Sequence, residues 1–165
     1  MPTALAPLPD GSLLITSLKG GVFCVVDADR DGDLDTYQPY FDDLATPFGV
    51  VVEKDSVLIG HKHELLRLFD DNHDGYAERA AVVSTGWGVT FDYHDWAIGP
   101  VPAGNGAYFM ALCCQQDKRT PAEALGRGQL IRTNASGGFE EVARGLRFPI
   151  GLARNDAGDL FSSDN

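Results

Sequence analysis

Two acidic stretches of the chain space their oxygen-bearing side chains as a divalent cation requires. Residues 27–35 have the sequence DADRDGDLD, and residues 70–78 have the sequence DDNHDGYAE. Both place oxygen donors at positions 1, 3, 5 and 9 and a glycine at position 6, where a calcium-binding loop bends sharply. The expected ligands are the side chains of Asp27, Asp29, Asp31 and Asp35 with the Asp33 carbonyl, and those of Asp70, Asn72, Asp74 and Glu78 with the Tyr76 carbonyl. We therefore expect each acidic loop to bind Ca²⁺.

The flanks of the acidic loops indicate hairpins between strands and not a helix–loop–helix site. A helix–loop–helix calcium site needs a bidentate Glu at position 12, and here that position holds Gln38 or Ala81. The runs GGVFCVVD and ELLRLFD that lead into the loops are apolar and of strand length. The alternative is a pair of ordinary turns rich in Asp, Asn and Gly, although the five carboxylates of 27–35 would repel one another without a cation.

The charge and composition of the chain exclude several classes of partner. The formal net charge is −11 at pH 7, which disfavours nucleic acid and anionic membrane surfaces. Nine of the 24 Asp and Glu residues lie in the two acidic loops, so much of this acidity is local. A chain of 165 residues with 44% hydrophobic residues suits one globular domain. No apolar run approaches the length of a membrane span.

The three cysteines do not fix a redox compartment. Cys24 lies in an apolar run and is expected to be a buried thiol. Cys113 and Cys114 are adjacent, and we expect their side chains to point to opposite faces of a strand. A disulfide between them is the less favoured alternative, because it would strain the peptide unit that joins them.

A repeated pattern of strands and turns runs through the chain. ALAPLPDGSLLITS at 4–17 matches GLARNDAGDLFSSD at 151–164, and the segments 49–60 and 95–111 fit the same frame. The four units begin at Ala4, Gly49, Asp95 and Gly151, at spacings of 45, 46 and 56 residues. Each unit starts with two strands joined by a turn, and two further strands flank the acidic loop where it is present. Four short strands in a repeat of this length are typical of a β-propeller blade.

We therefore predict an all-β fold: a β-propeller fragment with three four-stranded blades and the inner half of a fourth. The blades would span about 4–46, 47–93, 94–147 and 148–165 of a single partial domain over residues 1–165. Since propellers close with about four to eight blades, we expect further blades outside this sequence.

The third unit differs from the first two in its turn and in an insertion. Its turn carries uncharged residues, Thr133, Asn134, Ser136 and Gly138, in place of the acids, so no metal is expected there. The insertion contains Thr120-Pro121-Ala122-Glu123, which predicts a short helix. Thr120 would be its N-cap, and Glu123 would complete a capping box.

Residues just before the innermost strand of each blade are expected at the mouth of the central channel. These are Pro47-Phe48, Tyr93-His94 and Arg147-Phe148-Pro149. A histidine beside a cationic arginine suits a general base next to an anchor for an anion. Alternatively, His94 only caps the strand and Arg147 only pairs with an acid.

Aromatic and histidine side chains elsewhere have simpler interpretations. Trp87, Phe91, Tyr93 and Trp96 are expected around His94, where they would pack at a blade junction or stack on a sugar. His61 and His63 are interpreted as a surface turn and not as a metal site, because no carboxylate or cysteine partner is evident nearby.

Two segments carry a resemblance to a known family. HDWAIGPVPAGNGAYF and GLRFPIGLARNDAGDLFSSDN resemble the six-bladed propellers of pyrroloquinoline-quinone-dependent sugar dehydrogenases of the glucose and sorbosone type, including dehydrogenase-like propellers of planctomycete-type bacteria. The resemblance implies that His94 is the general base that takes the substrate's hydroxyl proton and that Arg147 contacts the quinone. The family pattern has Asn and Gln around the next proline, where this chain has Phe148 and Ile150.

The resemblance implies a calcium-binding propeller that oxidises a sugar or alcohol with pyrroloquinoline quinone, with a cytochrome c domain as electron acceptor. The alternative is a non-catalytic, calcium-stabilised propeller that binds a carbohydrate or a protein, because the acidic loops also resemble those of integrin-type propellers. A lactonase-type propeller would need acids in the channel, for which Asp95 and Asn165 are the nearby candidates. Loops of this kind suit extracellular calcium concentrations, so we expect a periplasmic or extracellular location.

Overall fold

The computed structural model describes residues 1–92, 94–114 and 118–165. Within these ranges the strands form three four-stranded antiparallel sheets and one two-stranded sheet. Blade 1 contains β1 (Pro2–Pro7), β2 (Leu13–Ser17), β3 (Val22–Val26) and β4 (Thr36–Phe41). Blade 2 contains β5 (Gly49–Glu53), β6 (Ser56–His61), β7 (Glu64–Phe69) and β8 (Arg79–Thr85). Blade 3 contains β9 (Ala97–Gly104), β10 (Ala107–Leu112), β11 (Gln129–Thr133) and β12 (Phe139–Arg144), and blade 4 contains β13 (Gly151–Arg154) and β14 (Leu160–Ser163).

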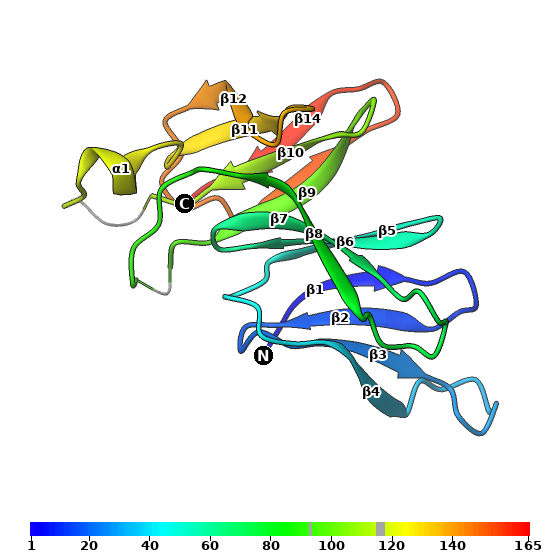
Figure 1. Cartoon of the computed structure of the whole chain (residues 1–165). Coiled ribbons are helices and arrows are strands. Elements are labelled where there is room, and N and C mark those ends of the chain that lie inside the picture. Colours follow the sequence, from blue (N-terminus) through cyan, green and yellow to red (C-terminus); the bar gives the residue numbers. More distant parts are fainter. Residues whose placement is uncertain (93, 115–117) are drawn as a thin grey trace.

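Within each blade the strands lie in chain order, so each is joined to the next by a hairpin. Figure 1 shows the blades following one another from the N-terminal to the C-terminal end. This arrangement confirms the predicted all-β propeller fragment with three whole blades and the inner pair of a fourth.

The hydrophobic core lies between the blades and not within any one of them. Leu14 and Val22 of blade 1 pack against Val57 and Ile59 of blade 2. A second cluster joins blades 2 and 3, and a third joins blade 3 to β13 and β14. The middle strands of blade 2 are therefore buried on both faces, whereas β2 alternates between buried and half-buried residues. A single blade cannot bury its faces alone, so stacking is what stabilises the fold.

Glycines allow the inner strands of neighbouring blades to approach closely. A Cβ atom on Gly49 would lie 1.6 Å from the carbonyl oxygen of Gly99 in β9, and one on Gly60 would lie 2.3 Å from the same oxygen. Any side chain at either position would therefore push blades 2 and 3 apart. This contact fixes the distance between β5 and β9. The residues of the candidate functional site lie just before these two strands in the chain.

The insertion in blade 3 forms the predicted short helix, α1 (Pro121–Ala124). The Thr120 side chain accepts a hydrogen bond from the Glu123 amide, and the Glu123 carboxylate accepts one from the Thr120 amide, which confirms the capping box. The helix lies flat on Gly88, where a Cβ atom would be 2.4 Å from the Ala122 carbonyl oxygen.

The two ends of the strands carry different features. The starts of β5, β9 and β13 lie at one end, which we call the mouth. Because the strands alternate in direction, the β3–β4 and β7–β8 loops lie at the opposite end. In Figure 1, α1 and the acidic loops accordingly lie on opposite sides of the molecule. None of the helices among the described residues is long and apolar enough to cross a membrane.

All three cysteines are free thiols. Cys24 and Cys113 are buried, and Cys114 is partly exposed. Burial raises the pKa of the Cys113 thiol to about 12. The expected buried thiol at Cys24 is confirmed, and Cys113 and Cys114 are not joined.

Candidate functional site

Three aromatic side chains from consecutive blades meet at the mouth. Phe48 precedes β5, Trp96 precedes β9, and Phe148 lies three residues before β13. Phe48 stacks on Trp96 with ring centroids 4.1 Å apart, and the Trp96 and Phe148 centroids are 4.8 Å apart. Each ring stands next to the start of an inner strand, so blade stacking alone brings the three together. We call these residues the aromatic cluster.

His94 lies against the aromatic cluster with its ring oriented by a carboxylate. Its centroid is 5.6 Å from that of Trp96 and 5.8 Å from that of Phe148. Nδ1 of His94 is 3.2 Å from Oδ1 of Asp92, which also accepts a hydrogen bond from the His94 amide at 2.7 Å. An ionised carboxylate can only accept, so Nδ1 donates to Asp92, and in the neutral form of this tautomer the lone pair is on Nε2. The side chain of His94 is 29% exposed, so His94 is a base that a solute can reach.

The surroundings of His94 differ in part from the prediction. Trp96 is in contact as expected, but Phe91 is fully exposed. Trp87 packs on Phe139 at 6.1 Å and donates a hydrogen bond to the Lys62 carbonyl, so it belongs to the core between blades 2 and 3. Tyr93 lies outside the described residues. Of the aromatic residues from the neighbouring blades, Phe148 contacts the His94 ring and Phe48 stacks on Trp96.

Arg147 lies at the same end of the sheets as His94. Its side chain is exposed, and the ring of the next residue, Phe148, contacts the His94 ring. The amides of Arg147 and Phe148 donate to the carboxylate of Asp164 at 3.0 Å and 2.7 Å. Asp164, directly after β14, therefore fixes the backbone that carries Arg147 and leaves the guanidinium side chain extended to solvent.

A buried ion pair lies under the loop that carries His94. Asp95 is 1% exposed and accepts hydrogen bonds from the amide and hydroxyl of Thr90 at 2.7 Å and 2.8 Å. Arg119 donates to the same carboxylate, with Nη1 3.0 Å from Oδ2. Burial alone would raise the pKa of Asp95, but the hydrogen bonds from Arg119 and Thr90 lower it. Asp95 thus stabilises the loop, with its oxygens turned to Thr90 and Arg119.

Arg127 ties both ends of the same loop to blade 2. It is 6% exposed and donates to the carbonyls of Gly88 and Trp96 and to that of Lys62. The bonds to Trp96 and Lys62 are 2.9 Å long. Burial lowers the pKa of Arg127 to about 10, so the guanidinium is still charged at neutral pH. Lys62 in turn donates its Nζ to the Asp92 carbonyl at 2.5 Å.

The first acidic loop brings three carboxylates together. Oxygens of Asp27, Asp29 and Asp31 lie within 4.8 Å of one another, and these groups could together hold a metal ion. Among the described residues, Asp35 is not in this group. Its amide continues the hairpin by donating to the Val26 carbonyl at 3.2 Å. The amide of Asp33 donates to Asp31 at 2.9 Å.

The second acidic loop gathers Asp70, Asp74 and Glu78 within the same 4.8 Å. The Asn72 side chain accepts a hydrogen bond from the Asp74 amide at 2.8 Å, and the Tyr76 amide donates to Asp74 at 2.9 Å. The carboxylate at position 9 is therefore part of the group in this loop, in contrast to the first.

The two acidic loops share one backbone conformation. In each, the carboxylate at position 1 accepts hydrogen bonds from the amides at positions 5 and 6, at 2.9–3.2 Å. Positions 4 and 6 have positive φ: 65° at Arg30 and 102° at Gly32, and 61° at His73 and 90° at Gly75. The spacing of Asp, Asn and Gly therefore produces the same turn twice, with carboxylates on its inner side.

The second loop also contacts the preceding blade. The Ala77 amide donates to the Tyr40 carbonyl at 2.8 Å, and a Cβ atom on Gly75 would lie 2.5 Å from Nε2 of Gln38. Burial, together with the charge of Asp70, raises the pKa of Tyr40 to about 12. The loop of blade 2 is thus part of the interface with blade 1.

The corresponding turn of blade 3 is closed by a neutral side chain. Oδ1 of Asn134 accepts hydrogen bonds from the amide and hydroxyl of Ser136 and from the amide of Gly138, at 2.7–3.1 Å. One amide oxygen performs the role that a carboxylate has in the other two turns. Because no cluster of acids forms in this turn, there is no repulsion between carboxylates that a cation would have to offset.

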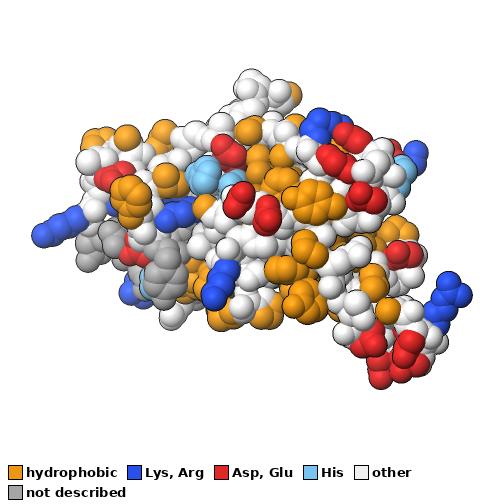
Figure 2. Space-filling model, turned by 60° about the horizontal axis from the view of Figure 1, so that its bottom comes forward, with side chains coloured by type: hydrophobic (Ala, Val, Ile, Leu, Met, Phe, Trp, Pro, Cys, Tyr) orange, Lys and Arg blue, Asp and Glu red, His pale blue; other side chains and the backbone are white. Residues whose placement is uncertain are grey.

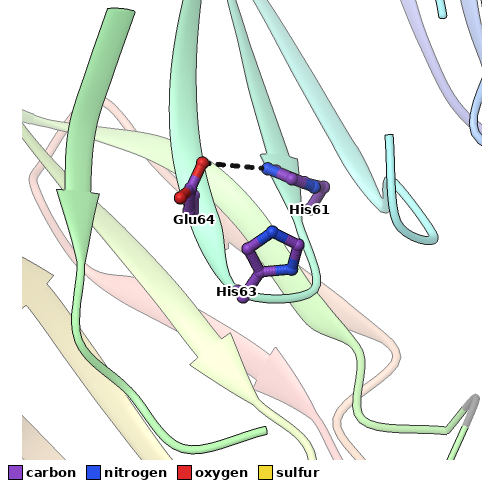
Figure 3. A group of neighbouring side chains, drawn as sticks. All are labelled: His61, His63 and Glu64. Atoms are coloured by element: carbon purple, nitrogen blue, oxygen red, sulfur yellow. Dashed lines mark ion pairs between the residues drawn. The ribbon is translucent and has the colours of Figure 1, made fainter. Parts of the chain in front are cut away.

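The interpretation of His61 and His63 as a surface turn is wrong for His61. His61 is only 3% exposed, and Nε2 of its ring is 3.6 Å from Oε2 of Glu64. Glu64 is the carboxylate that the sequence pattern did not reveal. It is three residues away in the chain but directly opposite His61 in the β6–β7 hairpin. Figure 3 shows these two side chains together with His63.

A family model described as "Domain of unknown function (DUF7133)" matches residues 7–165. The chain belongs to this family. No curated protein matches it. Solved structures similar to this DUF7133 chain include the holo form of the pyranose dehydrogenase PQQ domain from Coprinopsis cinerea, with 16% identity and a TM-score of 0.74 over 100% of this chain and 44% of that one.

Two further structures have the same fold. The calcium structure of a Trichoderma reesei carbohydrate-active enzyme of family AA12 has 15% identity and a TM-score of 0.76, covering 99% of this chain and 45% of that one. The PQQ-bound aldose sugar dehydrogenase from Streptomyces coelicolor has 18% identity and a TM-score of 0.72, covering 99% and 56%. The DUF7133 chain thus has the fold of PQQ-dependent sugar dehydrogenase-like propellers and spans about half the length of these structures.

Sequence reasoning missed the residues that hold the mouth of this DUF7133 propeller together. Arg119 and Arg127 come from the insertion and act on a loop 24 to 39 residues earlier in the chain. The available signal was two arginines in the insertion of an otherwise acidic chain. Ile150, one of the two apolar residues near Pro149, is 61% exposed, whereas Phe148 is partly buried in the aromatic cluster.

Proposed function

We propose that this chain is part of a propeller that oxidises a hydroxyl group of a sugar or other alcohol, using a quinone as electron acceptor and Ca²⁺ in its acidic loops. The observation that carries the proposal is the pair formed by His94 and Asp92 beside the aromatic cluster at the mouth. The names of the similar structures, a pyranose dehydrogenase and an aldose sugar dehydrogenase, support a sugar as the substrate class.

His94 is assigned the role of general base. Asp92 accepts a hydrogen bond from Nδ1, so Nε2 is the nitrogen that would take the proton of a substrate hydroxyl. Once His94 is protonated, the negative charge of Asp92 stabilises the imidazolium. The rings of Trp96 and Phe148 beside it suit the apolar C–H faces of a sugar ring. These groups orient a hydroxyl and remove its proton.

A quinone such as pyrroloquinoline quinone is planar and anionic, and the residues at the mouth fit one edge of such a group. The aromatic cluster offers flat ring surface, and Arg147 offers a cation for a carboxylate. Phe148 and Ile150 add no polar contact, so the remaining anchors would come from residues outside this chain. When bound, the quinone would supply the two-electron acceptor that alcohol oxidation requires.

Calcium is assigned to the two acidic loops. Each offers three clustered carboxylates on a turn with the same internal hydrogen bonds, and hard cations favour such oxygen ligands. The loops lie at the opposite end of the sheets from His94, so the ion would stabilise the blades without touching the substrate. Loops of this kind bind at extracellular calcium levels, which supports a periplasmic or extracellular location.

The test uses the full-length protein with calcium and pyrroloquinoline quinone. Quinone binding is followed by its absorption spectrum, and sugar oxidation by reduction of a redox dye. We expect His94→Gln to lower dye reduction by at least about 100-fold, the usual contribution of a general base, with quinone binding retained. His73→Gln, at an exposed histidine of the second acidic loop, is the matched control and should be without effect. A wild-type protein that binds the quinone but reduces no dye with any sugar would overturn the proposal.

A second candidate function is a non-catalytic, calcium-stabilised propeller that binds a carbohydrate. It is favoured by Phe148 and Ile150, which put apolar surface where the resemblance implies polar cofactor contacts. Under this alternative, sugars would bind at the aromatic cluster and quench Trp96 fluorescence, and the quinone would not bind.

A further inference from the structure

The hairpin between β6 and β7 brings two imidazoles and a carboxylate to one place. His61 ends β6 and Glu64 begins β7, and they are register partners, so their side chains lie on the same face. His63 lies in the two-residue turn between them, and its ring centroid is 4.5 Å from that of His61. Figure 3 shows the three side chains around a common point at the end of the hairpin.

His61 has a buried nitrogen without a hydrogen-bond partner among the described residues. Nε2 is shielded from solvent, and the nearest charged oxygen, on Glu64, is 3.6 Å away, which is too far for a hydrogen bond. Buried polar atoms are rarely left in this state, so this one needs an explanation.

We propose that His61, His63 and Glu64 bind a divalent transition-metal ion of the Zn²⁺ or Cu²⁺ type. Their donor atoms already lie within 4.8 Å of one another, so modest side-chain rotations would bring them to bonding distance of one ion. Imidazole nitrogen suits these metals better than Ca²⁺, which prefers oxygen. Three protein ligands would leave a fourth position for water, as in open zinc sites. The inference of this site does not rest on the proposed oxidation or on calcium in the acidic loops.

Binding has a cost that limits the affinity. Nδ1 of His61 accepts a hydrogen bond from the Ala45 amide at 3.3 Å. Ligation through Nε2 requires the ring proton on Nδ1, so the metal must displace this contact. The bond is at the long end of the range for amide donors, so the loss is small. We therefore expect weaker binding than at a four-ligand structural zinc site.

The hairpin also contacts the loop that carries His94. Lys62, between the two histidines, donates to the Asp92 carbonyl at 2.5 Å, and its own carbonyl accepts hydrogen bonds from Trp87 and Arg127. A metal that fixes the hairpin would therefore also fix the backbone of Asp92, the residue that orients His94.

The test is a titration of the metal-free, chelator-treated protein with Cu²⁺, followed by electron paramagnetic resonance. We expect about one tight equivalent per chain, with nitrogen hyperfine splitting from two imidazoles and competition by Zn²⁺ but not by millimolar Ca²⁺. His63→Ala should remove one nitrogen from the spectrum, and both His63→Ala and Glu64→Gln should weaken binding at least about tenfold. His63 and Glu64 are more exposed than His61, so these variants should fold, which melting curves in chelator would check.

His73→Ala is the matched control, because His73 is an exposed histidine among acids. It should leave the spectrum and the affinity unchanged. Two results would overturn the proposal: an unchanged nitrogen pattern in His63→Ala, or an equal loss of binding in His73→Ala, which would indicate an adventitious ion only.

Discussion

Replacing Arg127 with methionine should loosen the loop that positions His94. Methionine keeps much of the apolar stem and removes the guanidinium, which donates to the carbonyls of Gly88, Trp96 and Lys62. Through the carbonyls of Gly88 and Trp96, Arg127 joins both ends of the segment 88–96. The perturbation therefore removes a cross-link and creates only a small cavity.

The expected loss can be worked out from these contacts. The three shorter charge-assisted bonds, at about 1.5 kcal/mol each, give roughly 4–5 kcal/mol, and the bond to the Cys113 carbonyl, at 3.5 Å, adds little. Removing a charge that is costly to bury, as the lowered pKa of Arg127 indicates, offsets about 2 kcal/mol of this. We expect the free energy of unfolding to fall by about 2–3 kcal/mol. Arg132→Met is the matched control, because Arg132 is partly exposed and only pairs with Glu140, so its loss should stay below about 1 kcal/mol.

Urea unfolding measures the overall loss, and hydrogen exchange shows where it arises. The amides of Gly88 and Asp95, which bond to the carbonyls of Leu125 and Asp92, should exchange at least about tenfold faster in Arg127→Met. Amides of the blade 1 strands should not change beyond the global effect. Equal losses in Arg127→Met and Arg132→Met, with unchanged exchange at Gly88 and Asp95, would refute the argument that these carbonyl bonds hold the loop.

Three further outcomes are expected. The pKa of Asp95 in the folded protein is lowered from its ordinary value of 3.8. The ionised carboxylate therefore stabilises the fold above pH 3.8, and this stabilisation is lost as the pH falls through the lowered pKa. In urea unfolding, Asp95→Asn should be less stable than the wild type at pH 7 and should lose less stability than the wild type between about pH 4 and pH 2. Iodoacetamide at about pH 8.5 should modify Cys114 and spare Cys113, whose pKa is about 12, as mass spectrometry would show. Asp31→Ala should lower the melting temperature only when calcium is supplied. Asp55→Ala, at an exposed acid outside the loops, should have no calcium-dependent effect. Equal losses in Asp31→Ala with and without calcium would indicate that the loop is an ordinary turn that binds no ion.

The features that local sequence determines were predictable. The propeller fragment followed from the repeat, because each unit encodes its own hairpins and exposes faces that only a neighbour can bury. The capping box at Thr120 and Glu123 and the matching turns of the acidic loops depend on residues within a few positions of one another. Such contacts form wherever the right residue types have the right spacing.

The features that depend on stacking were not predictable. Phe48 reaches Trp96 and Phe148 reaches His94 because blades 2 and 4 flank blade 3, a relation between residues about 50 positions apart. The burial of His61 depends on which face of β6 is turned toward blade 1. The pairing of His61 with Glu64 depends on the register of a hairpin with a two-residue turn. Arg127 satisfies main-chain carbonyls, which no side-chain pattern reveals.

The antiparallel blade places the acidic loops and His94 at opposite ends of the sheets. The loop between the third and fourth strands must lie at the end opposite the start of the first strand, which puts the acidic loops far from His94. In Figure 2 the densest group of acidic side chains lies at one end of the molecule, and other acids are spread over the rest of this face. The β6–β7 hairpin lies at the mouth. Of the three groups of described residues that could hold a metal ion, the one formed by His61, His63 and Glu64 is therefore at the same end as His94. Under the proposed assignments, a calcium ion would therefore change the stability of this propeller without touching the substrate, whereas a transition metal at the hairpin would act on the loop that carries His94.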